Sequence, residues 1–316
     1  MQADPSQFLL FSGSSNPALT KEIAEYLGIQ LSPVELEIFP DGEISVQIME
    51  SVRGRDVFVV QTIAHRPNHY LMELLILIDA LKRASARSVV AVIPYFGYCR
   101  QDRKDKPRVP ITAKLVANLI VCAGATRVLT MDLHAGQLQG FFDIPVDNLH
   151  AQPYLAKAFK KLHPGQVVVT APDIGSVKLA KIYANDLHCD FAVIDKHRID
   201  PTKVAVVNVI GDVQEKDVLL ADDMCSTAET LLSAAKACQG KGARKIFAGI
   251  AHGIFSDGAI EKIDQSPIEA LFVTNTIPPN EAALRSGKIQ VVSVAPLFGQ
   301  AIRCIVSQES IASLDD

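Results

Sequence analysis

The sequence lacks several features that would each place it in a broad class of proteins. It has no excess of positive charge, because 31 Lys and Arg residues stand against 35 Asp and Glu residues among 316, a formal net charge of −4. The chain-wide basic field on which nucleic-acid binders depend is therefore missing. Its longest strongly apolar segment, residues 71–80, contains Glu73 and Asp79 and is too short to span a bilayer. We expect neither nucleic acid nor a membrane as a partner.

Metal-type cysteine spacing and a secretory leader are missing as well. The six cysteines have no CxxC or Cys/His ligand spacing, which favours reduced thiols in a cytoplasmic protein: Cys99, Cys122, Cys189, Cys225, Cys238 and Cys304. The first ten residues carry no basic segment and only a short apolar run, so we expect no secretory signal. A cytoplasmic protein with this charge must bind any anionic ligand through local positive clusters or metal ions.

The chain does contain a regular alternation of short apolar runs and amphipathic helical patterns. The predicted strands are 56–61, 88–93, 127–131, 166–170, 190–194, 217–220, 245–250 and 269–274. The predicted helices are 71–84, 111–123, 154–162, 176–187 and 230–239. Near-continuous apolar strands are typical of parallel sheets covered on both faces. We predict an α/β protein with two doubly wound domains, residues 1–149 and 150–316.

The most informative local segment is residues 217–230, in which an apolar run, two acids, a small turn and a helix follow one another. At such a strand-to-helix turn, backbone N–H groups and the positive helix end face one concavity, which suits a phosphate. Two adjacent carboxylates can accept hydrogen bonds from vicinal sugar hydroxyls. The segment therefore predicts a pentose phosphate site at Asp222, Asp223, Ser226, Thr227, Ala228, Glu229 and Thr230. The alternative is an ordinary helix capped by Asp and Thr.

This segment resembles the phosphoribosyl diphosphate motif of type I phosphoribosyltransferases, with two departures. Glu229 stands where relatives usually carry Gly, and Ser226 replaces a common Asp. A carboxylate about 4 Å from a phosphate costs on the order of 4 kcal/mol at an effective dielectric of 20. We therefore predict that Glu229 points into solvent. The serine is a milder change because it removes a negative charge near the phosphate.

Five further segments are similar to motifs of the ribose-phosphate pyrophosphokinase family and occur in that family's order. They are FPDGE at 39–43, RQD at 100–102, MDLHA at 131–135, PDIG at 172–175 and KHR at 196–198. On these motifs the chain is identified as a member of that family. It departs from the commoner PDxGG pattern at Ser176, and Leu179 stands where many relatives have Arg.

The resemblance implies a role for each matching residue. Adenine recognition falls to Phe39, Asp41 and Glu43, and further ATP contacts to Arg100, Gln101 and Asp102. His134 and Asp173 are implied to hold Mg²⁺, which prefers one or two carboxylates together with phosphate oxygens and water. Lys196 and Arg198 are implied to neutralise the migrating diphosphoryl group from a flexible catalytic loop.

The resemblance also implies a fold, an activity and an assembly. The expected fold is two similar type I phosphoribosyltransferase-like domains, each a mainly parallel sheet flanked by helices. The N-terminal domain would carry the ATP motifs, and the C-terminal domain the ribose 5-phosphate loop and the catalytic loop. The expected reaction moves the diphosphoryl group of ATP onto ribose 5-phosphate. The expected assembly is a homohexamer built from dimers.

Two other functions are compatible with parts of the sequence. A nucleobase phosphoribosyltransferase needs only the phosphate loop, and the FPDGE and KHR segments argue against it. A catalytically silent regulatory homologue would bind ligands without turnover. The presence of His134, Asp173, Lys196 and Arg198 argues against silence, whereas the unusual Ser226 and Glu229 leave it open.

Overall fold

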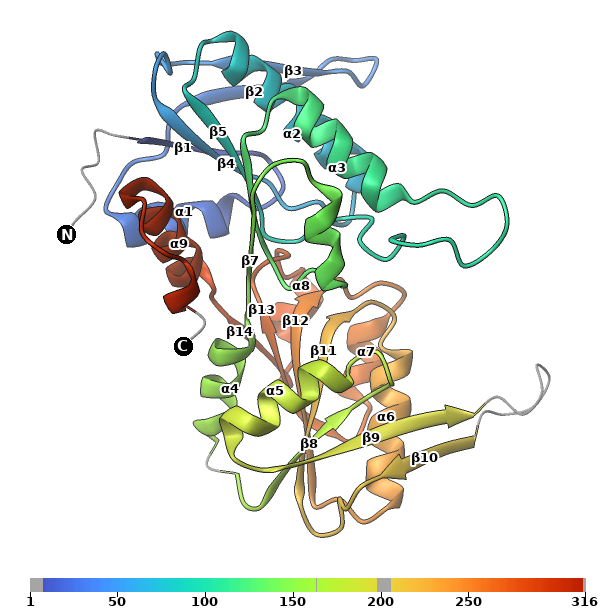
Figure 1. Ribbon diagram of the computed structural model, residues 1–316. Coiled ribbons are helices and arrows are strands. Elements are labelled where there is room, and N and C mark those ends of the chain that lie inside the picture. The colour runs from blue at the N-terminus through green and yellow to red at the C-terminus, as the bar shows by residue number, and fades with distance from the viewer. Residues whose placement is uncertain (1–7, 163, 198–205, 315–316) are drawn as a thin grey trace. The chain divides into compact units, whose positions relative to one another are not determined.

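The computed structural model describes residues 8–162, 164–197 and 206–314 of the chain (Figure 1). Internal contacts divide these residues into two compact units. The first unit comprises the chain up to residue 150 together with 276–278 and the segment from 293 onward, and the second comprises 151–275 and 279–292. No helix in the described ranges is long and apolar enough to cross a membrane.

The first unit is built on a five-stranded sheet in which all neighbouring strands run parallel. In spatial order its strands are β1 (Phe8–Ser12), β4 (Asp56–Val60), β5 (Ser88–Ile93), β6 (Arg127–Met131) and β7 (Val146–Leu149). Its helices are α1 (Pro17–Leu27), α2 (Pro67–Arg83), α3 (Thr112–Ala123), the 3₁₀ helix η1 (Gly136–Phe141) and α9 (Ala295–Ser307), followed by the 3₁₀ turn η2 (Ala312–Leu314). Parallel strands need such crossover helices, which here cover the sheet.

The second unit is built on a seven-stranded sheet. In spatial order its strands are β10 (Val206–Ile210), β9 (Asp190–His197), β8 (Val167–Ala171), β11 (Asp217–Cys225), β12 (Lys245–Gly253), β13 (Ile268–Thr274) and β14 (Ile289–Val292). Only the edge strand β10 is antiparallel to its neighbour. The helices are α4 (Gln152–Lys160), α5 (Val177–Leu187), α6 (Glu229–Gly240), α7 (Ala259–Asp264) and α8 (Glu281–Arg285).

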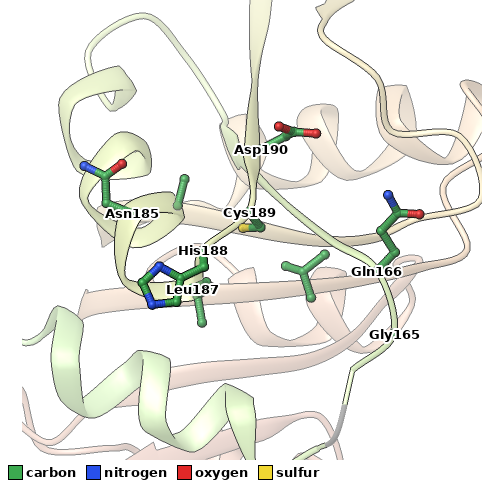
Figure 2. Close-up of a pocket in the computed structure, with 9 residues that line it drawn as sticks. Gly165, Gln166, Asn185, Leu187, His188, Cys189 and Asp190 are labelled. Carbon is green, nitrogen blue, oxygen red and sulfur yellow. The ribbon is translucent and has the colours of Figure 1, made fainter.

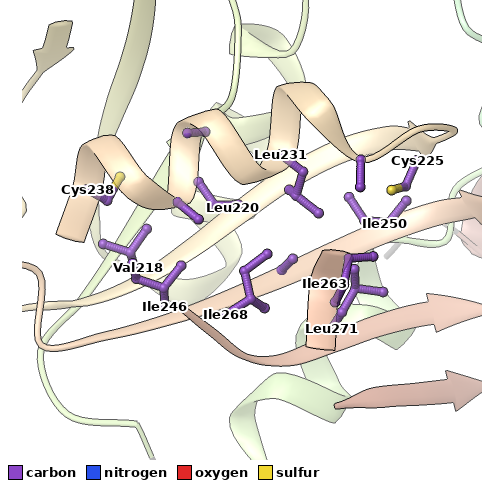
Figure 3. Packing of buried hydrophobic residues seen from close by; sticks show 14 of the residues in the cluster. Val218, Leu220, Cys225, Leu231, Cys238, Ile246, Ile250, Ile263, Ile268 and Leu271 are labelled. Atoms are coloured by element: carbon purple, nitrogen blue, oxygen red, sulfur yellow. The ribbon is translucent and has the colours of Figure 1, made fainter. Parts of the chain in front are cut away.

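Successive residues of β12 show how helices cover both faces of this sheet. Ile246, Ala248 and Ile250 point into a buried cluster shared with α6 and α7 (Figure 3). Phe247, on the opposite face, lies edge-on to Phe159 of α4 with the ring centroids 5.4 Å apart. A strand buried on both faces needs an unbroken apolar run, which is what the sequence pattern of β12 provides.

Each unit contains a β-hairpin after the helix that follows the first strand of its sheet. In the first unit, β2 (Val34–Ile38) and β3 (Ile44–Ile48) form a separate two-stranded antiparallel sheet. In the second unit, β9 and β10 form an antiparallel pair that joins the main sheet through β8. The whole order of elements from β1 to α4 is repeated from β8 to α9, with η1 in the place of α8. The two units are therefore two copies of one α/β plan.

The predicted strands and helices all occur, with shifts at their ends. The largest shifts are in β11, which continues through Cys225 beyond its predicted end at 220, and in α2, which begins at Pro67 and not at 71; β9 also continues past its predicted end at 194, to His197. The sequence reasoning missed β1, β2, β3, β7, β10, β14, α1, α7, α8 and α9. The predicted C-terminal domain, 150–316, also differs from the second unit at one place. The segment from residue 293 packs in the first unit, because α9 lies against α1.

Candidate active site

The phosphate loop lies where β11 passes into α6. Three residues at this turn belong to the buried cluster of the second unit: Cys225, Ala228 and Leu231 (Figure 3). The loop is also bonded to the segment after β12, since the Ser256 N–H donates to the Ser226 carbonyl over 3.0 Å. The neighbouring parallel strand ends and this core together fix the course of the loop.

The two acids of the loop lie within β11 and not after it. β11 stays paired with β12 as far as Cys225, with Asp222 opposite Ile250. The predicted end of the strand at 220 is therefore wrong, because the ladder to β12 continues. Successive side chains of a strand point to opposite faces, so Asp222 and Asp223 do not face the same way.

The beginning of α6 is open to an anion. Its N-cap residue is Ala228, in a left-handed conformation with φ of 65°, and no side chain caps the helix. The alternative prediction, a helix capped by Asp or Thr, is therefore wrong for this turn. A helix end whose first N–H groups lack a side-chain cap favours phosphate. Thr227 and Thr230 are both half-buried beside it.

Glu229 is the first residue of α6, and its side chain is exposed. This exposure agrees with the prediction that the carboxylate points into solvent. An acid in the first turn stabilises the helix through the helix dipole, by about 0.3–1 kcal/mol at an exposed site. The same charge opposes binding of a phosphate at that helix end.

Asp222 is held in an unusual ionisation state. Burial, together with the Asp223 and Asp173 charges, raises the pKa of its carboxyl to about 7, and the hydrogen bond from the Ser176 hydroxyl works in the opposite direction. A carboxyl with this pKa is partly protonated at neutral pH. Binding of a cation or of sugar hydroxyls that donate to the carboxylate would favour its charged form.

One serine connects Asp222 with the loop after β8. The Ser176 hydroxyl lies 2.6 Å from Asp222 Oδ1 and 3.3 Å from Asp173 Oδ1. The Ser176 backbone N–H donates to the same Asp173 oxygen over 3.2 Å. The structure thus brings the predicted metal residue and the predicted ribose residue together within the second unit. The sequence showed Ser176 only as a departure from a pattern and gave it no role.

The sequence reasoning also missed a hydrogen-bonded pair of serines. Ser226 and Ser256 share a hydroxyl–hydroxyl hydrogen bond of 2.9 Å. Cys225, which lies beside them, is no candidate nucleophile, because burial, with help from the Asp222 charge, raises the pKa of its thiol to about 12. A neutral thiol in a packed cluster behaves as a small apolar side chain.

In the first unit, the FPDGE segment is the tip of the β2–β3 hairpin. The tip is closed by hydrogen bonds from the Phe39 N–H to the Glu43 carbonyl and from the Gly42 N–H to the Phe39 carbonyl, both 2.8 Å. Gly42 has φ of 94°, a left-handed conformation that favours glycine. The Phe39 side chain is 47% exposed, and Asp41 and Glu43 are exposed as well. The hairpin therefore presents an aromatic ring and two carboxylates to solvent.

The RQD segment follows β5, and the MDLHA segment follows its parallel neighbour β6. Arg100 and Gln101 are exposed, and Asp102 is half-buried. Asp102 accepts a hydrogen bond of 3.3 Å from Gln137 of η1, just after His134. The two motifs therefore meet at one edge of the first sheet. The sequence reasoning did not single out Gln137.

The predicted metal residues have different surroundings. Asp173 is half-buried and uses only Oδ1 in the hydrogen bonds described, whereas His134 is exposed. No cluster of three or more His, Cys, Asp or Glu side chains suited to a metal occurs within the described residues. A carboxylate such as Asp173 fits Mg²⁺, which takes its remaining ligands from phosphates and water.

The predicted catalytic pair is only partly described. Lys196 lies on β9, opposite Val207 of β10 in the antiparallel ladder. Arg198 lies outside the described residues, as do residues 199–205. The hairpin formed by β9 and β10 occupies the same place in the order of elements as the FPDGE hairpin of the first unit.

A cavity of about 660 Å³ lies away from these motifs (Figure 2). It is lined by residues at the start of β8 and β9 and the end of α5, among them Gln166, His188, Cys189 and Asp190. Asp173 follows the opposite end of β8. The cavity therefore belongs to the edge of the sheet that carries none of the predicted site residues.

Comparisons with known proteins agree with these motifs. Residues 8–124 match the N-terminal domain of ribose phosphate pyrophosphokinase, and residues 197–315 match the phosphoribosyl synthetase-associated domain. A ribose-phosphate pyrophosphokinase of Wolinella succinogenes is 53% identical over 97% of this chain and 98% of its own length. That of Caldanaerobacter subterraneus is also 53% identical, over 96% of both chains.

A solved structure resembles almost the whole chain. The phosphoribosylpyrophosphate synthetase of Mycobacterium smegmatis matches with a TM-score of 0.90 and 38% identity, over 96% of this chain and 99% of its own. The matched part of the chain extends across both units. The chain therefore belongs to the ribose-phosphate pyrophosphokinase family.

Proposed function

We propose that this protein is a ribose-phosphate diphosphokinase that converts ATP and ribose 5-phosphate into 5-phosphoribosyl 1-diphosphate and AMP. The C1 hydroxyl oxygen of the ribose attacks the β-phosphorus of ATP and forms the new P–O bond. The bond from that phosphorus to the oxygen shared with the α-phosphate breaks, and AMP leaves with this oxygen. The hydroxyl proton passes to solvent. The full-length similarity to ribose-phosphate pyrophosphokinases carries this proposal.

Ribose 5-phosphate binds to the loop between β11 and α6. The uncapped start of α6 and the hydroxyls of Thr227 and Thr230 receive the phosphate. Asp222 accepts hydrogen bonds from the ribose hydroxyls, and Asp223 contributes the negative charge that it places beside Asp222. Ser226, Ala228 and Glu229 complete the loop, with the Glu229 carboxylate in solvent.

ATP binds to the motifs of the first unit. The exposed Phe39 ring stacks on the adenine, and Asp41 and Glu43 accept hydrogen bonds from its amino group. Arg100 supplies positive charge to the phosphates, while Gln101 and Asp102 orient the nucleotide. Phe39, Asp41 and Glu43 belong to the tip of the β2–β3 hairpin, and Arg100, Gln101 and Asp102 belong to the segment between β5 and α3.

Asp173 and His134 would hold a Mg²⁺ ion that neutralises charge on the ATP phosphates. Lys196 and Arg198 stabilise the negative charge on the diphosphoryl group during transfer. Phosphoryl transfer depends on positioning and charge stabilisation more than on covalent help, so no general base is required.

We further propose that the protein acts in the cytoplasm as a homohexamer built from dimers. All six cysteines are free thiols, as expected in a reducing compartment. Sedimentation velocity measurements would test the assembly, since a monomer at working concentrations would contradict it.

The decisive test is product formation from ATP, ribose 5-phosphate and Mg²⁺, with Lys196→Ala measured in parallel. We expect equal amounts of AMP and phosphoribosyl diphosphate, and a loss of at least about 100-fold in the variant, comparable to removal of one charge-stabilising group. Folded protein that binds ATP but produces no AMP would instead indicate a regulatory homologue. Product formation only from phosphoribosyl diphosphate and a nucleobase would indicate a phosphoribosyltransferase.

A further inference from the structure

Ser176 makes a set of contacts that the proposed reaction does not by itself require. Its N–H donates to Asp173 Oδ1, and its hydroxyl lies 2.6 Å from Asp222 Oδ1. Asp173 follows β8 and Asp222 lies on β11, so the two carboxylates come from different strands. We propose that Ser176 is a positioning residue that turns the Asp222 carboxylate toward the ribose. This inference rests on the proposed binding of ribose 5-phosphate at Asp222.

The hydrogen bonds around Asp222 explain how it is oriented. Its Oδ1 atom accepts bonds from the Ser176 hydroxyl and from the Asp223 N–H at 3.0 Å. Its Oδ2 atom has no hydrogen-bond partner among the described residues. A carboxylate fixed through one oxygen presents the other in a defined direction, which suits bonds to sugar hydroxyls.

The hydroxyl has one proton, and the geometry assigns it to Asp222. The distance to Asp222 Oδ1 is 2.6 Å, against 3.3 Å to Asp173 Oδ1, and shorter O–H···O contacts are the stronger ones. Asp173 keeps its own bond from the backbone N–H, which does not depend on the side chain. Loss of the hydroxyl therefore removes the shorter of the two hydrogen bonds to Asp222 Oδ1 and leaves the backbone bond to Asp173 in place.

The Ser176 hydroxyl also does not make the hydrogen bond that a serine at the start of a helix normally makes. Ser176 is the N-cap residue of α5, yet its side chain caps no N–H group of the helix. A serine N-cap normally accepts from the second or third helical N–H. With only 7% of its surface exposed, Ser176 has little water available to replace the bond to Asp222.

A glycine at this position, as in the commoner PDxGG pattern, would keep the N–H bond and lose the hydroxyl bond. The orientation of the Asp222 carboxylate by a side-chain hydrogen bond therefore depends on the serine of this chain. Because Asp222 is buried beside Asp223, a fixed orientation has more value here than at an exposed acid.

The test is ribose 5-phosphate binding measured by calorimetry without ATP or Mg²⁺, using the full chain. Ser176→Ala and Ser176→Gly should each weaken binding by about tenfold, the lower range for a hydrogen bond to a charged group. Ser176→Thr keeps the hydroxyl and should bind within about twofold of the parent. Ser266→Ala, which removes a hydroxyl bonded to the Ile263 carbonyl elsewhere in the second unit, is the matched control.

Kinetics separate a positioning role from a general loss of structure. We expect the KM for ribose 5-phosphate to rise in the Ala and Gly variants while the KM for ATP is unchanged. Ala and Gly variants that bind ribose 5-phosphate as tightly as the parent, or tighter, would overturn the inference. A parent protein that neither binds ribose 5-phosphate nor turns over would instead overturn the proposed function. The Gly variant keeps the test valid if the Ala variant fails to fold.

Discussion

At the scale of single residues, burial and the proposed binding of ribose 5-phosphate favour opposite ionisation states of the Asp222 carboxyl. Ligand binding needs a charged carboxylate, whereas burial and the neighbouring Asp223 and Asp173 charges raise its pKa to about 7. The unliganded protein therefore stores unfavourable electrostatic free energy at this position. Such conflicts are common at functional sites, where stability is sacrificed for activity.

The conflict predicts a pH-dependent gain of stability in Asp222→Asn. The native carboxyl binds its proton more tightly than the unfolded one, so the parent's free energy of unfolding falls as pH rises from about 4 to 7. The asparagine has no such loss. We expect the variant to gain little near pH 4 and between about 1 and 4 kcal/mol above pH 7, while ribose 5-phosphate binding is lost.

Urea unfolding of the parent and the variant at pH 4.5, 6 and 8 would measure this difference. A difference that stays constant across the three pH values would contradict the explanation. The loss of binding needs a separate calorimetric titration, because a stable variant can still bind the ligand poorly.

Glu229 leads to a prediction about affinity. Glu229→Gln removes a negative charge from the helix end that we propose as the phosphate site. Because the side chain is exposed, the gain is limited to about a threefold lower KM for ribose 5-phosphate at low salt, the range of a helix-end charge. The gain should shrink at high ionic strength.

Glu261→Gln is the matched control for this measurement. Glu261 is likewise an exposed acid in the first turn of a helix, but that helix is α7, outside the phosphate loop. An equal change of KM in both variants would show that net charge, and not the position of Glu229, is responsible.

At the scale of single elements, the β2–β3 hairpin makes few contacts that stabilise the rest of the first unit through the proposed ATP contact Phe39. It forms its own two-stranded sheet, and its tip is closed by backbone hydrogen bonds that do not involve the Phe39 ring. Phe39→Ala should therefore change the free energy of unfolding by no more than about 0.5 kcal/mol. It should raise the KM for ATP by about tenfold, the upper range for an aromatic stacking contact.

Phe39→Tyr is the informative companion variant, because it keeps a ring that can stack. Steady-state kinetics with ATP varied at saturating ribose 5-phosphate would compare the three proteins. If the Tyr and Ala variants lose affinity equally, stacking is not the basis of the contact.

The elements that could be predicted from sequence are those whose pattern is local. Buried strands such as β5 and β12 are continuous apolar runs, and α2 has its apolar residues on one stripe. The β2–β3 hairpin was missed because its strands carry charged and polar residues and bury no complete face. β9 and β11 were predicted too short, because pairing with a neighbouring strand sustained them past their apolar cores.

The candidate site shows the same limit. Motif order located Asp173 and Asp222, but their connection through Ser176 joins positions 46 residues apart along the chain. Such a bond depends on the register between β8 and β11 and on a side-chain rotamer, neither of which is present in a local pattern. The free start of α6 was equally hidden, since Thr and Ser near a helix start ordinarily suggest a cap.

At the scale of the whole molecule, the two units share one order of elements but differ in the side chains at the ends of their corresponding strands. In the second unit, the ends of β8 and β11 carry Asp173 and Asp222. In the first unit, the corresponding ends of β1 and β4 are filled by the protein's own side chains. Glu73, only 2% exposed, accepts hydrogen bonds from the Ser14 N–H at 2.7 Å and from Gln61 Nε2 at 2.7 Å.

The two copies are also linked by their last helices. α4 follows β7 of the first sheet but packs in the second unit, against α5. α9 follows β14 of the second sheet but packs in the first unit, against α1. Arg303 of α9 stacks over Tyr26 at 4.8 Å and donates to its carbonyl over 2.9 Å.

This arrangement predicts that a substitution near the C-terminal end destabilises the first unit. Phe298 of α9 is fully buried, so Phe298→Ala should lower the free energy of unfolding by about 3–5 kcal/mol. Gln300→Ala, at an exposed position of the same helix, should change it by less than about 0.5 kcal/mol. Amide hydrogen exchange of Phe298→Ala would locate the effect. We expect faster exchange in α1. Faster exchange only in peptides of the second unit would contradict the prediction.

The exchange of last helices has a consequence for how the protein is made. α1 ends at residue 27 and α9 begins at residue 295, so at about 5–20 residues per second the ribosome delivers the second helix on the order of tens of seconds after the first. During that interval the nascent first unit has its sheet but not the helix that covers α1. The part of the protein that is synthesised first is thus completed last. A chaperone that binds the uncovered face of α1 would bind during this interval.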